Sequence, residues 1–253
     1  LRVVTGVEID RTAIEDFLRH HPNREHLLIK TADGPLRLKD LAPLPELPFK
    51  EQVERVEQLL RDLGLGNKMD NHRVVDWQNQ TISLTLNGTS ISDLTTLQDI
   101  TSLVHLAVGD TAVEDIRPLA NLTRLKALGL QGTQVRDLRP LSGLTELGTL
   151  NLGGTPVTDL RPLAGLTRLY HLTLWAAKNL SDITPLHGLR ELQTLQLLGT
   201  SVSDLSPLHG LPNLKELHLQ GLPITEMQLR LLFRYHPVPA NLHVVIRDRT
   251  ALW

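Results

Sequence analysis

The chain has 253 residues, with 26 lysines and arginines, 28 aspartates and glutamates, and no cysteine. A formal net charge of −2 disfavours a general binder of polyanions, so no nucleic-acid partner is expected. The lack of cysteine excludes disulfides, thiolate metal sites and a cysteine nucleophile, and no apolar run is long enough to span a membrane.

Residues 1–80 are expected to form a cap with the order helix, hairpin, helix. The first helix is predicted over residues 10–20, and the hairpin strands over 26–30 and 36–39. A second helix is predicted over 49–63, with an apolar stripe made of Val53, Val56, Leu60 and Leu63. We expect it to pack on the segment that follows, which would otherwise end in exposed leucines.

A short strand over 73–77 comes next, and Trp77 is expected to cover the core behind it. From Thr81 onward, one 22-residue pattern occurs seven times. The copies begin at Thr81, Leu103, Leu125, Leu147, Leu169, Leu192 and Leu214. The copy that begins at Leu169 has 23 residues, because residues 175–179 replace the usual short turn.

Each position of the repeat has a predicted structural role. Leucines at positions 4 and 6, such as Leu128 and Leu130, alternate with small or polar residues as in a half-buried strand. A threonine at position 9 can bond the backbone where the chain leaves that strand. Apolar residues at positions 11, 14, 17 and 20 complete a core that one copy cannot bury alone.

Position 13 carries an aspartate in six consecutive copies. We expect each carboxylate to cap a short helical turn, and we favour this role over a metal site because each has its own amide donors nearby. These residues are Asp93, Asp115, Asp137, Asp159, Asp182 and Asp204. Arginines two residues later, at Arg117, Arg139 and Arg161, are expected to neutralise them rather than to form an anion site.

The end of the chain departs from the pattern. A helix over 226–236 and a strand over 241–247 are predicted to form a C-terminal cap. The repeats then occupy residues 81–237, with the last copy serving as a helical cap, and residues 238–253 form a capping strand and tail. Trp253 belongs to this cap or to a continuation of the chain.

The consensus LxxLxLxGTxVxDLxPLxxLTx resembles the leucine-rich repeats of the internalin-type, 22-residue bacterial class. The resemblance implies an α/β solenoid, right-handed, with a concave parallel sheet, short helical or 3-10 turns on the convex side, and helical caps. It also implies protein recognition on the concave face. The family usually has asparagine at position 9, where this chain has threonine, and nothing here resembles a signal peptide or a cell-wall sorting signal.

Side chains at positions 3, 5 and 7 point away from the core, so the concave face can be predicted row by row. They are small in the first four copies and large in the last three. Trp175 and Leu198 suggest an apolar anchor, with Gly153 leaving space for the indole ring. The predicted partner-binding residues are Asn151, Tyr170, His171, Thr173, Trp175, Gln196, Leu198, His218 and Gln220. The alternative is that Trp175 only covers the bulge in its own repeat.

No catalytic set or cofactor motif emerges, and the chain is not expected to be an enzyme. His187 and His209 share a convex position and are expected to be a surface pair rather than a metal site. We therefore expect a monomeric module that binds a protein or peptide and needs no cofactor.

Two other functions stay open. The chain could be the substrate-targeting domain of a larger multidomain bacterial enzyme or effector, or a spacer without a partner on this face. Because it begins at Leu1 without methionine, we expect a segment of a larger protein. The expected location is the bacterial cytoplasm or a host cell after secretion, rather than the bacterial surface.

Overall fold

The computed structural model describes residues 28–31, 34–37 and 47–246, and the chain divides into two compact units, Leu1–Glu46 and Leu47–Trp253. In the first unit, β1 (Leu28–Thr31) pairs antiparallel with β2 (Gly34–Arg37). This pairing confirms the predicted hairpin, although its second strand begins at Gly34 rather than at residue 36. The helix predicted over residues 10–20 lies outside the described residues.

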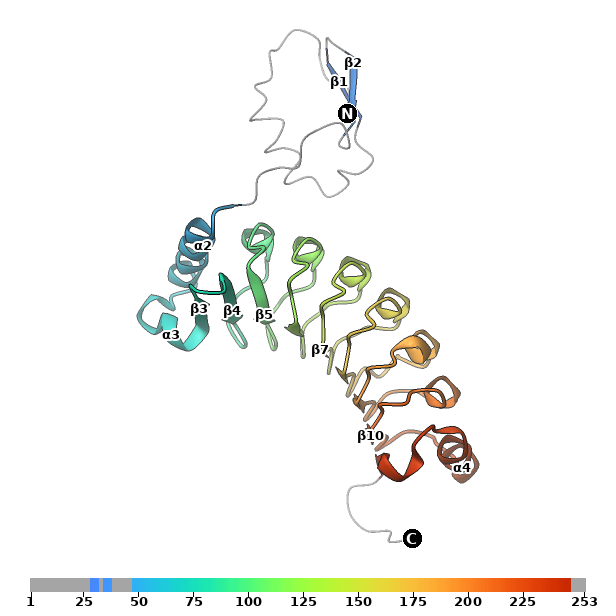
Figure 1. The fold of residues 1–253 in the computed structure, drawn as a ribbon. Coiled ribbons are helices and arrows are strands. Elements are labelled where there is room, and N and C mark those ends of the chain that lie inside the picture. Colours follow the sequence, from blue (N-terminus) through green and yellow to red (C-terminus); the bar gives the residue numbers. More distant parts are fainter. Residues whose placement is uncertain (1–27, 32–33, 38–46, 247–253) are drawn as a thin grey trace. The chain divides into compact units, whose positions relative to one another are not determined.

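The second unit begins with helix α2 (Phe49–Asp62), as predicted. Val53, Val56 and Leu60 are buried, and Leu63 is half-buried against the same core. The side chain of Gln52, also buried, accepts a hydrogen bond from the amide of Ser102 at 2.9 Å. The helix is thereby attached to the first repeat, whose open end it covers (Figure 1).

After α2 the chain forms η3 (Gly66–Lys68), α3 (Met69–His72) and strand β3 (Arg73–Asp76), which pairs antiparallel with β4. The prediction that Trp77 covers the core is wrong. Its side chain is 60% exposed and meets the ring of Phe49 edge-on, with 5.2 Å between the ring centroids. Trp77 lies just beyond the last residue of β3, whereas Val75, within the strand, packs on the core.

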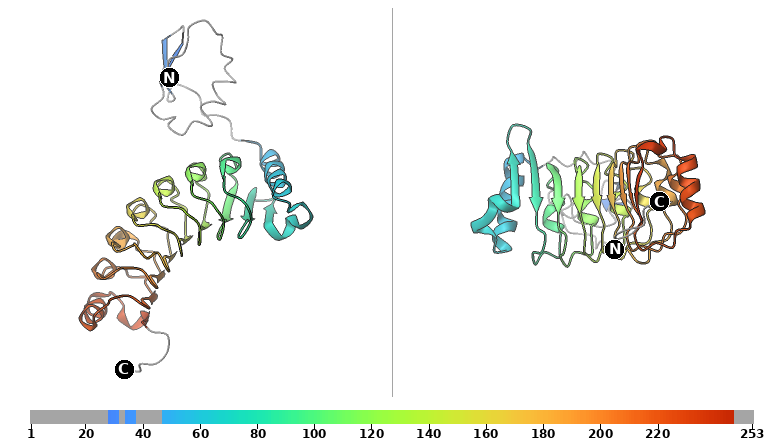
Figure 2. Two further views of the ribbon diagram at one scale, coloured as in Figure 1. Left: turned by 180° about the vertical axis from the view of Figure 1, so that it is seen from behind. Right: turned by 90° about the horizontal axis from the view of Figure 1, so that it is seen from below.

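From β4 onward the strands are parallel and in sequence order, within a nine-stranded sheet that β3 begins. They line the inner side of the unit's curve, and 3-10 turns lie on the outer side (Figures 1 and 2). The strands are β4 (Thr81–Thr85), β5 (Leu103–Ala107), β6 (Ala127–Gly129), β7 (Thr149–Asn151), β8 (His171–Thr173), β9 (Thr194–Gln196), β10 (Glu216–His218) and β11 (His243–Val245). The turns are η4 (Thr95–Leu97), η5 (Arg117–Leu119), η6 (Arg139–Leu141), η7 (Arg161–Leu163), η8 (Thr184–Gly188) and η9 (Ser206–Leu208).

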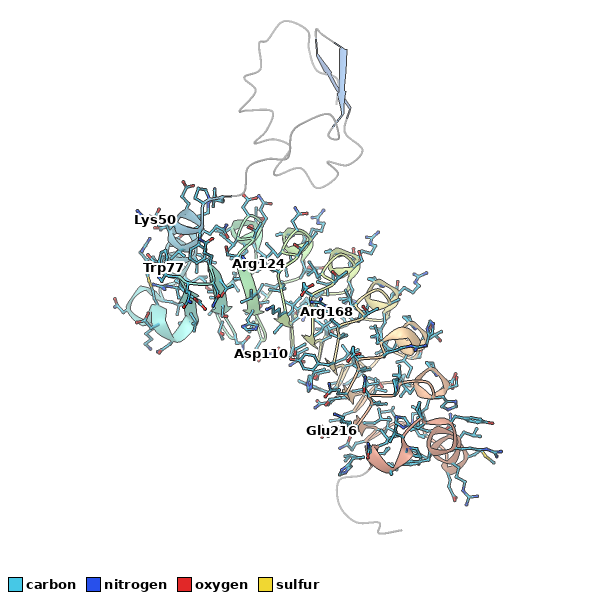
Figure 3. The ribbon with its side chains drawn as sticks, viewed as in Figure 1. Lys50, Trp77, Asp110, Arg124, Arg168 and Glu216 are labelled. Carbon is cyan, nitrogen blue, oxygen red and sulfur yellow. The ribbon has the colours of Figure 1, made fainter. Side chains whose placement is uncertain are left out.

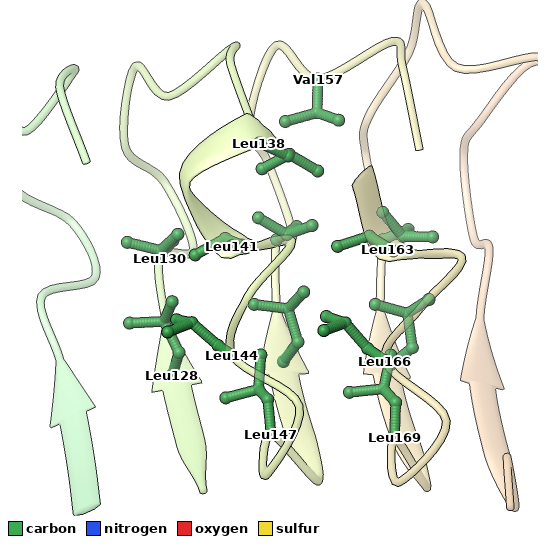
Figure 4. Close-up of a cluster of buried hydrophobic side chains, with 14 of the residues drawn as sticks. Leu128, Leu130, Leu138, Leu141, Leu144, Leu147, Val157, Leu163, Leu166 and Leu169 are labelled. Atoms are coloured by element: carbon green, nitrogen blue, oxygen red, sulfur yellow. The ribbon is translucent and has the colours of Figure 1, made fainter. Parts of the chain in front are cut away.

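The predicted core rows are buried between successive repeats. Leu128 and Leu130 of one copy and Leu150 and Leu152 of the next are at most 1% exposed (Figure 4). In the five copies with threonine at position 9, its hydroxyl donates to the carbonyl oxygen three residues earlier, as Thr133 does to Leu130 at 2.6 Å. This bond holds the bend after the strand in those copies, as the sequence predicted.

The C-terminal cap contains helix α4 (Glu226–Tyr235), η10 (Pro239–Asn241) and strand β11. Thr225 and Gln228 form a reciprocal capping box at the start of α4, which fixes where the helix begins. Leu232 on its inner face is fully buried. The predicted helix is confirmed but is one residue shorter than expected. The strand predicted over 241–247 is confirmed over His243–Val245, and residue 247 lies outside the described residues.

A left-handed backbone residue follows each strand at position 8 of the repeat. It is glycine in most copies, but Asp110 and Ala176 occupy it with φ of 56°. We predict that Gly88→Ala lowers the free energy of unfolding by about 1–2 kcal/mol, because φ is 66° there while nothing lies within 4 Å of the new methyl group. Chemical denaturation measures the loss.

Gly143→Ala is the matched control, since its surroundings are equally open and its φ is ordinary. It should be neutral or stabilise by up to about 1 kcal/mol. Equal effects of the two substitutions would contradict the strain argument.

Candidate functional site

The register of the sheet aligns equivalent positions of successive repeats in rows across the concave face. His171 pairs with Thr194, and Thr173 pairs with Gln196, so each row runs at right angles to the strands. Positions 3, 5 and 7 contain no lysine or arginine, and Glu216 is their one acidic residue. Glu216 lies near the carboxyl-terminal end of the sheet and Trp77 near the other end (Figure 3). A partner would thus meet an almost uncharged surface.

Trp175 and Leu198 lie side by side at the carboxyl ends of β8 and β9. Trp175 is 37% exposed and Leu198 is 42% exposed. The backbone amide of Ala176, the residue after Trp175, donates to the carbonyl of Leu198 at 2.7 Å. The indole of Trp175 lies over Gly153 of the previous repeat, where any side chain would collide with the indole nitrogen. Both the exposure and the use of Gly153 as space for the ring agree with the prediction.

Tyr170 lies apart from this pair. It precedes β8, and its ring lies over Gly148, where a Cβ would be 2.6 Å from the tyrosine Cε1. Five residues of extended chain, roughly 16 Å, separate it from Trp175. The ring is 48% exposed, but it lies at the amino-terminal ends of the strands, whereas Trp175 lies at their carboxyl ends, so the two do not form one aromatic cluster.

Thr173 is not available to a partner, which contradicts its predicted role. Its side chain is only 4% exposed, and its hydroxyl is 3.2 Å from Nε2 of His171. Asn151 and Gln196 are its partners in the two neighbouring strands. The short threonine therefore lies below the level of the longer side chains around it.

The remaining predicted residues are half-buried on the concave face. Asn151 accepts a hydrogen bond from the amide of Gly153 at 3.0 Å, so it also supports the turn under Trp175. Gln220 follows Leu198 in the same row, and its Oε1 is buried without a hydrogen-bond partner. Gln196 and Gln220 thus border the apolar pair on two sides.

His218 belongs to a polar group that sequence reasoning did not recognise. Its Nε2 is 2.8 Å from Oε1 of Glu216, and His243 is the partner of Glu216 in the adjacent strand. The pKa of Glu216 is lowered, first by the hydrogen bond from His218 and then by the charges of His218, His243 and His171. The sequence did not indicate that His243 lies beside Glu216. That position depends on the register between β10 and β11, which the repeat pattern does not predict.

On the convex side the aspartates have the predicted role. Oδ1 of Asp137 accepts the amide hydrogen of Arg139 at 3.0 Å, and Nη2 of the same arginine is 2.7 Å from Oδ2. Asp115 and Asp159 bind Arg117 and Arg161 in the same way. The arginine stripe is therefore neutralised by its own repeat.

Two further candidates from the sequence have ordinary surroundings. Nδ1 of His187 is 2.9 Å from the carbonyl oxygen of Thr184, and the ring of His209 stacks on Tyr235 with 5.4 Å between centroids. Among the residues that the structure describes, no three histidine, aspartate or glutamate side chains gather as they would around a metal ion.

No family model and no curated protein matches the sequence. Among solved structures, internalin C2 of Listeria monocytogenes is 35% identical, with 65% of this chain and 69% of that chain covered and a TM-score of 0.57. The chain is an internalin-type leucine-rich repeat protein. Internalin F of the same bacterium is 26% identical, with a TM-score of 0.59. The match covers 81% of this chain and 59% of internalin F.

A leucine-rich repeat protein of Leptospira interrogans is 22% identical, with a TM-score of 0.58 and 42% of its length covered, and shows a likeness in fold alone. These organisms are bacteria, as the repeat class suggested. In the described part of this internalin-type chain, the helices are too short or too polar to cross a bilayer.

The position of the Trp175 ring over Gly153 leads to a prediction. Gly153→Ala should displace the indole, because a methyl group would occupy the volume of its nitrogen. We expect a red shift in tryptophan fluorescence as the ring becomes more exposed. Gly165→Ala, whose new methyl group would have nothing within 4 Å, should leave the spectrum unchanged. Identical spectra for both variants would contradict this position of the indole ring over Gly153.

A second prediction concerns acid stability. The pKa of Asp159 is lowered to about 2, mainly by its hydrogen bond from Arg161, and the pKa values of Asp115 and Asp137 are lowered by the equivalent arginines. Groups with depressed folded-state pKa values stabilise the fold above their unfolded pKa, ~3.9, and lose this effect as pH falls. The thermal midpoint should therefore fall between about pH 4 and 2.

Circular dichroism melting curves at successive pH values measure this fall. Asp159→Asn should show a shallower dependence on pH, because it removes one of the carboxylates that must be protonated. An equally steep dependence in the variant would rule out its contribution.

Proposed function

We propose that this chain is a protein–protein interaction module that binds a protein or peptide partner through the carboxyl-terminal half of its concave face. The observation that carries the proposal is the exposed pair Trp175 and Leu198, side by side on the sheet. Tryptophan is enriched among the residues that dominate binding energy, because it buries a large area with little loss of side-chain entropy.

The backbone under this pair is held on both sides. The amide of Gly154 donates to the carbonyl of Trp175 at 2.6 Å, and the amide of Gly199 donates to that of Gln220 at 3.0 Å. The indole also rests on the backbone of Gly153. A surface that is ordered before binding loses little further conformational entropy when a partner docks, so more of the contact energy appears as affinity.

The composition of the face favours a partner recognised by apolar contacts and neutral hydrogen bonds. The pair is surrounded by the amide groups of Asn151, Gln196 and Gln220. No lysine or arginine occupies positions 3, 5 and 7 of the repeats. Tyr170 supplies a separate anchor roughly 16 Å away along the strand direction. A partner that engages both anchors would have to span the full width of the sheet.

We predict that Trp175→Ala combined with Leu198→Ala abolishes capture of the partner while the thermal midpoint changes little. Both side chains are substantially exposed, so their removal creates no cavity in the core. The measurement is a pull-down with the full chain, read by mass spectrometry, beside a melting curve for each variant.

Trp77→Ala combined with Val74→Ala is the matched control, since it removes a tryptophan and an aliphatic residue that are even more exposed, at 60% and 66%, from the other end of the sheet. It should leave capture intact. Undiminished capture by the Trp175 and Leu198 variant would contradict the proposal. Strong destabilisation with binding intact would show that these side chains have a structural role.

A further inference from the structure

Glu216 is the one aspartate, glutamate, lysine or arginine at positions 3, 5 and 7 of the repeats. It begins β10, and its side chain is 50% exposed. Its register partners are Thr194 on β9 and His243 on β11. Lys215 precedes it in the chain, but within the described residues no lysine or arginine forms an ion pair with it. The carboxylate is therefore open to a cation from another molecule.

This carboxylate is also held in place. Its Oε1 is 2.8 Å from Nε2 of His218, two residues further along the strand. A carboxylate only accepts hydrogen bonds, so the imidazole nitrogen is the donor. The bond favours the ionised form and lowers the pKa of Glu216, which is therefore charged at neutral pH. Among the described residues Oε2 has no hydrogen-bond partner, and a group held in this way loses little conformational freedom when a cation docks.

Glu216 and the apolar pair lie near opposite ends of adjacent strands. The register aligns Glu216 with Thr194, so Leu198 lies four residues further along and one strand to the side. With about 3.3 Å per residue and about 4.8 Å between strands, the two positions are roughly 14 Å apart. Residues four apart in an extended chain lie on one face, separated by about 13 Å. A partner segment that runs along the strands therefore reaches both positions with two residues at this spacing.

We propose that the partner presents an extended segment in which a lysine or arginine binds Glu216 while an apolar side chain four residues away docks on Trp175 and Leu198. The inference rests on the proposed function, since it uses the same apolar pair. Charge complementarity selects this occupant: positions 3, 5 and 7 carry no lysine or arginine that competes for the carboxylate, and an acidic residue there would be repelled. The apolar contact supplies most of the affinity, and Glu216 determines specificity.

The probe is a fluorescein-labelled peptide that contains Leu-Thr-Ser-Thr-Arg between glycines, titrated with the full chain by fluorescence anisotropy at low salt. Three comparison peptides replace the arginine by glutamine, replace it by glutamate, or omit one spacer residue, which places leucine and arginine on opposite faces. We expect the arginine peptide to bind about threefold tighter than the glutamine peptide, as for one exposed ion pair. The glutamate peptide should bind most weakly, and the shortened peptide should lose the gain from arginine.

High salt should remove the difference between the arginine and glutamine peptides, because surface charges are screened. Equal affinity of these two peptides at low salt, or no binding by either, would overturn the proposal.

Substitutions of Glu216 assign the preference to this carboxylate. Glu216→Gln should erase it, while the amide oxygen of glutamine still accepts the bond from His218. Glu216→Lys should reverse it, so that the glutamate peptide binds tighter than the arginine peptide, a result that a purely structural role would not produce. Glu114→Gln is the matched control, because it removes an equal charge from an exposed residue outside positions 3, 5 and 7.

Circular dichroism establishes that each variant is folded. Glu114→Gln should keep the preference for arginine. A preference that persists in folded Glu216→Gln would overturn the proposal.

The two proposals fail in different ways. If the peptides bind without preference for arginine while Trp175→Ala combined with Leu198→Ala abolishes binding, the contact at Glu216 is wrong and the apolar pair stands. If arginine is preferred while capture of the natural partner is independent of Trp175 and Leu198, the apolar pair is not the anchor and the cation contact at Glu216 stands.

Discussion

The burial of each repeat's leucines by the next repeat is the interaction on which the rest of the structure depends. Strands such as β6, β7 and β8 are only three residues long, yet Leu128, Leu150 and Leu172 at their centres are at most 1% exposed. A three-residue strand with one inward side chain has little stability alone. Its free energy comes from area shared with both neighbours, so the stack needs a cover at each end, which α2 and α4 provide.

This arrangement separates the two surfaces of the solenoid. On the convex side, each position-13 aspartate accepts a hydrogen bond from a backbone amide of its own turn, and Asp115, Asp137 and Asp159 also bind the arginine there, which leaves little for a ligand. On the concave side, the ladder satisfies the backbone and the core needs only positions 4 and 6. The core therefore does not constrain the side chains at positions 3, 5 and 7, although Asn87 and Asn151 accept hydrogen bonds from the amides of Gly109 and Gly153.

Three of the larger side chains beside the sheet lie over a glycine of the previous repeat. Because neighbouring strands are only about 4.8 Å apart, a side chain that leans across the sheet occupies the place of a side chain one repeat earlier. Accordingly Trp175 lies over Gly153, Tyr170 over Gly148, and Gln131 over Gly109. The candidate site is thus shaped by pairs of residues that are separated by one repeat in the sequence, and it inherits the stiffness of the ladder beneath it.

The sequence by itself determined the repeat, the core rows, the position-9 threonine bonds, the aspartate caps and the helices at both ends, because these depend on contacts within one repeat or on strict periodicity. Only the tertiary structure decided that Thr173 is covered, that Tyr170 lies over Gly148, that Trp77 is exposed and that His218 and His243 both neighbour Glu216. The physical reason is that a side chain's exposure and direction depend on the sizes of its neighbours across the sheet. Those neighbours follow from the register between strands, which no single repeat contains.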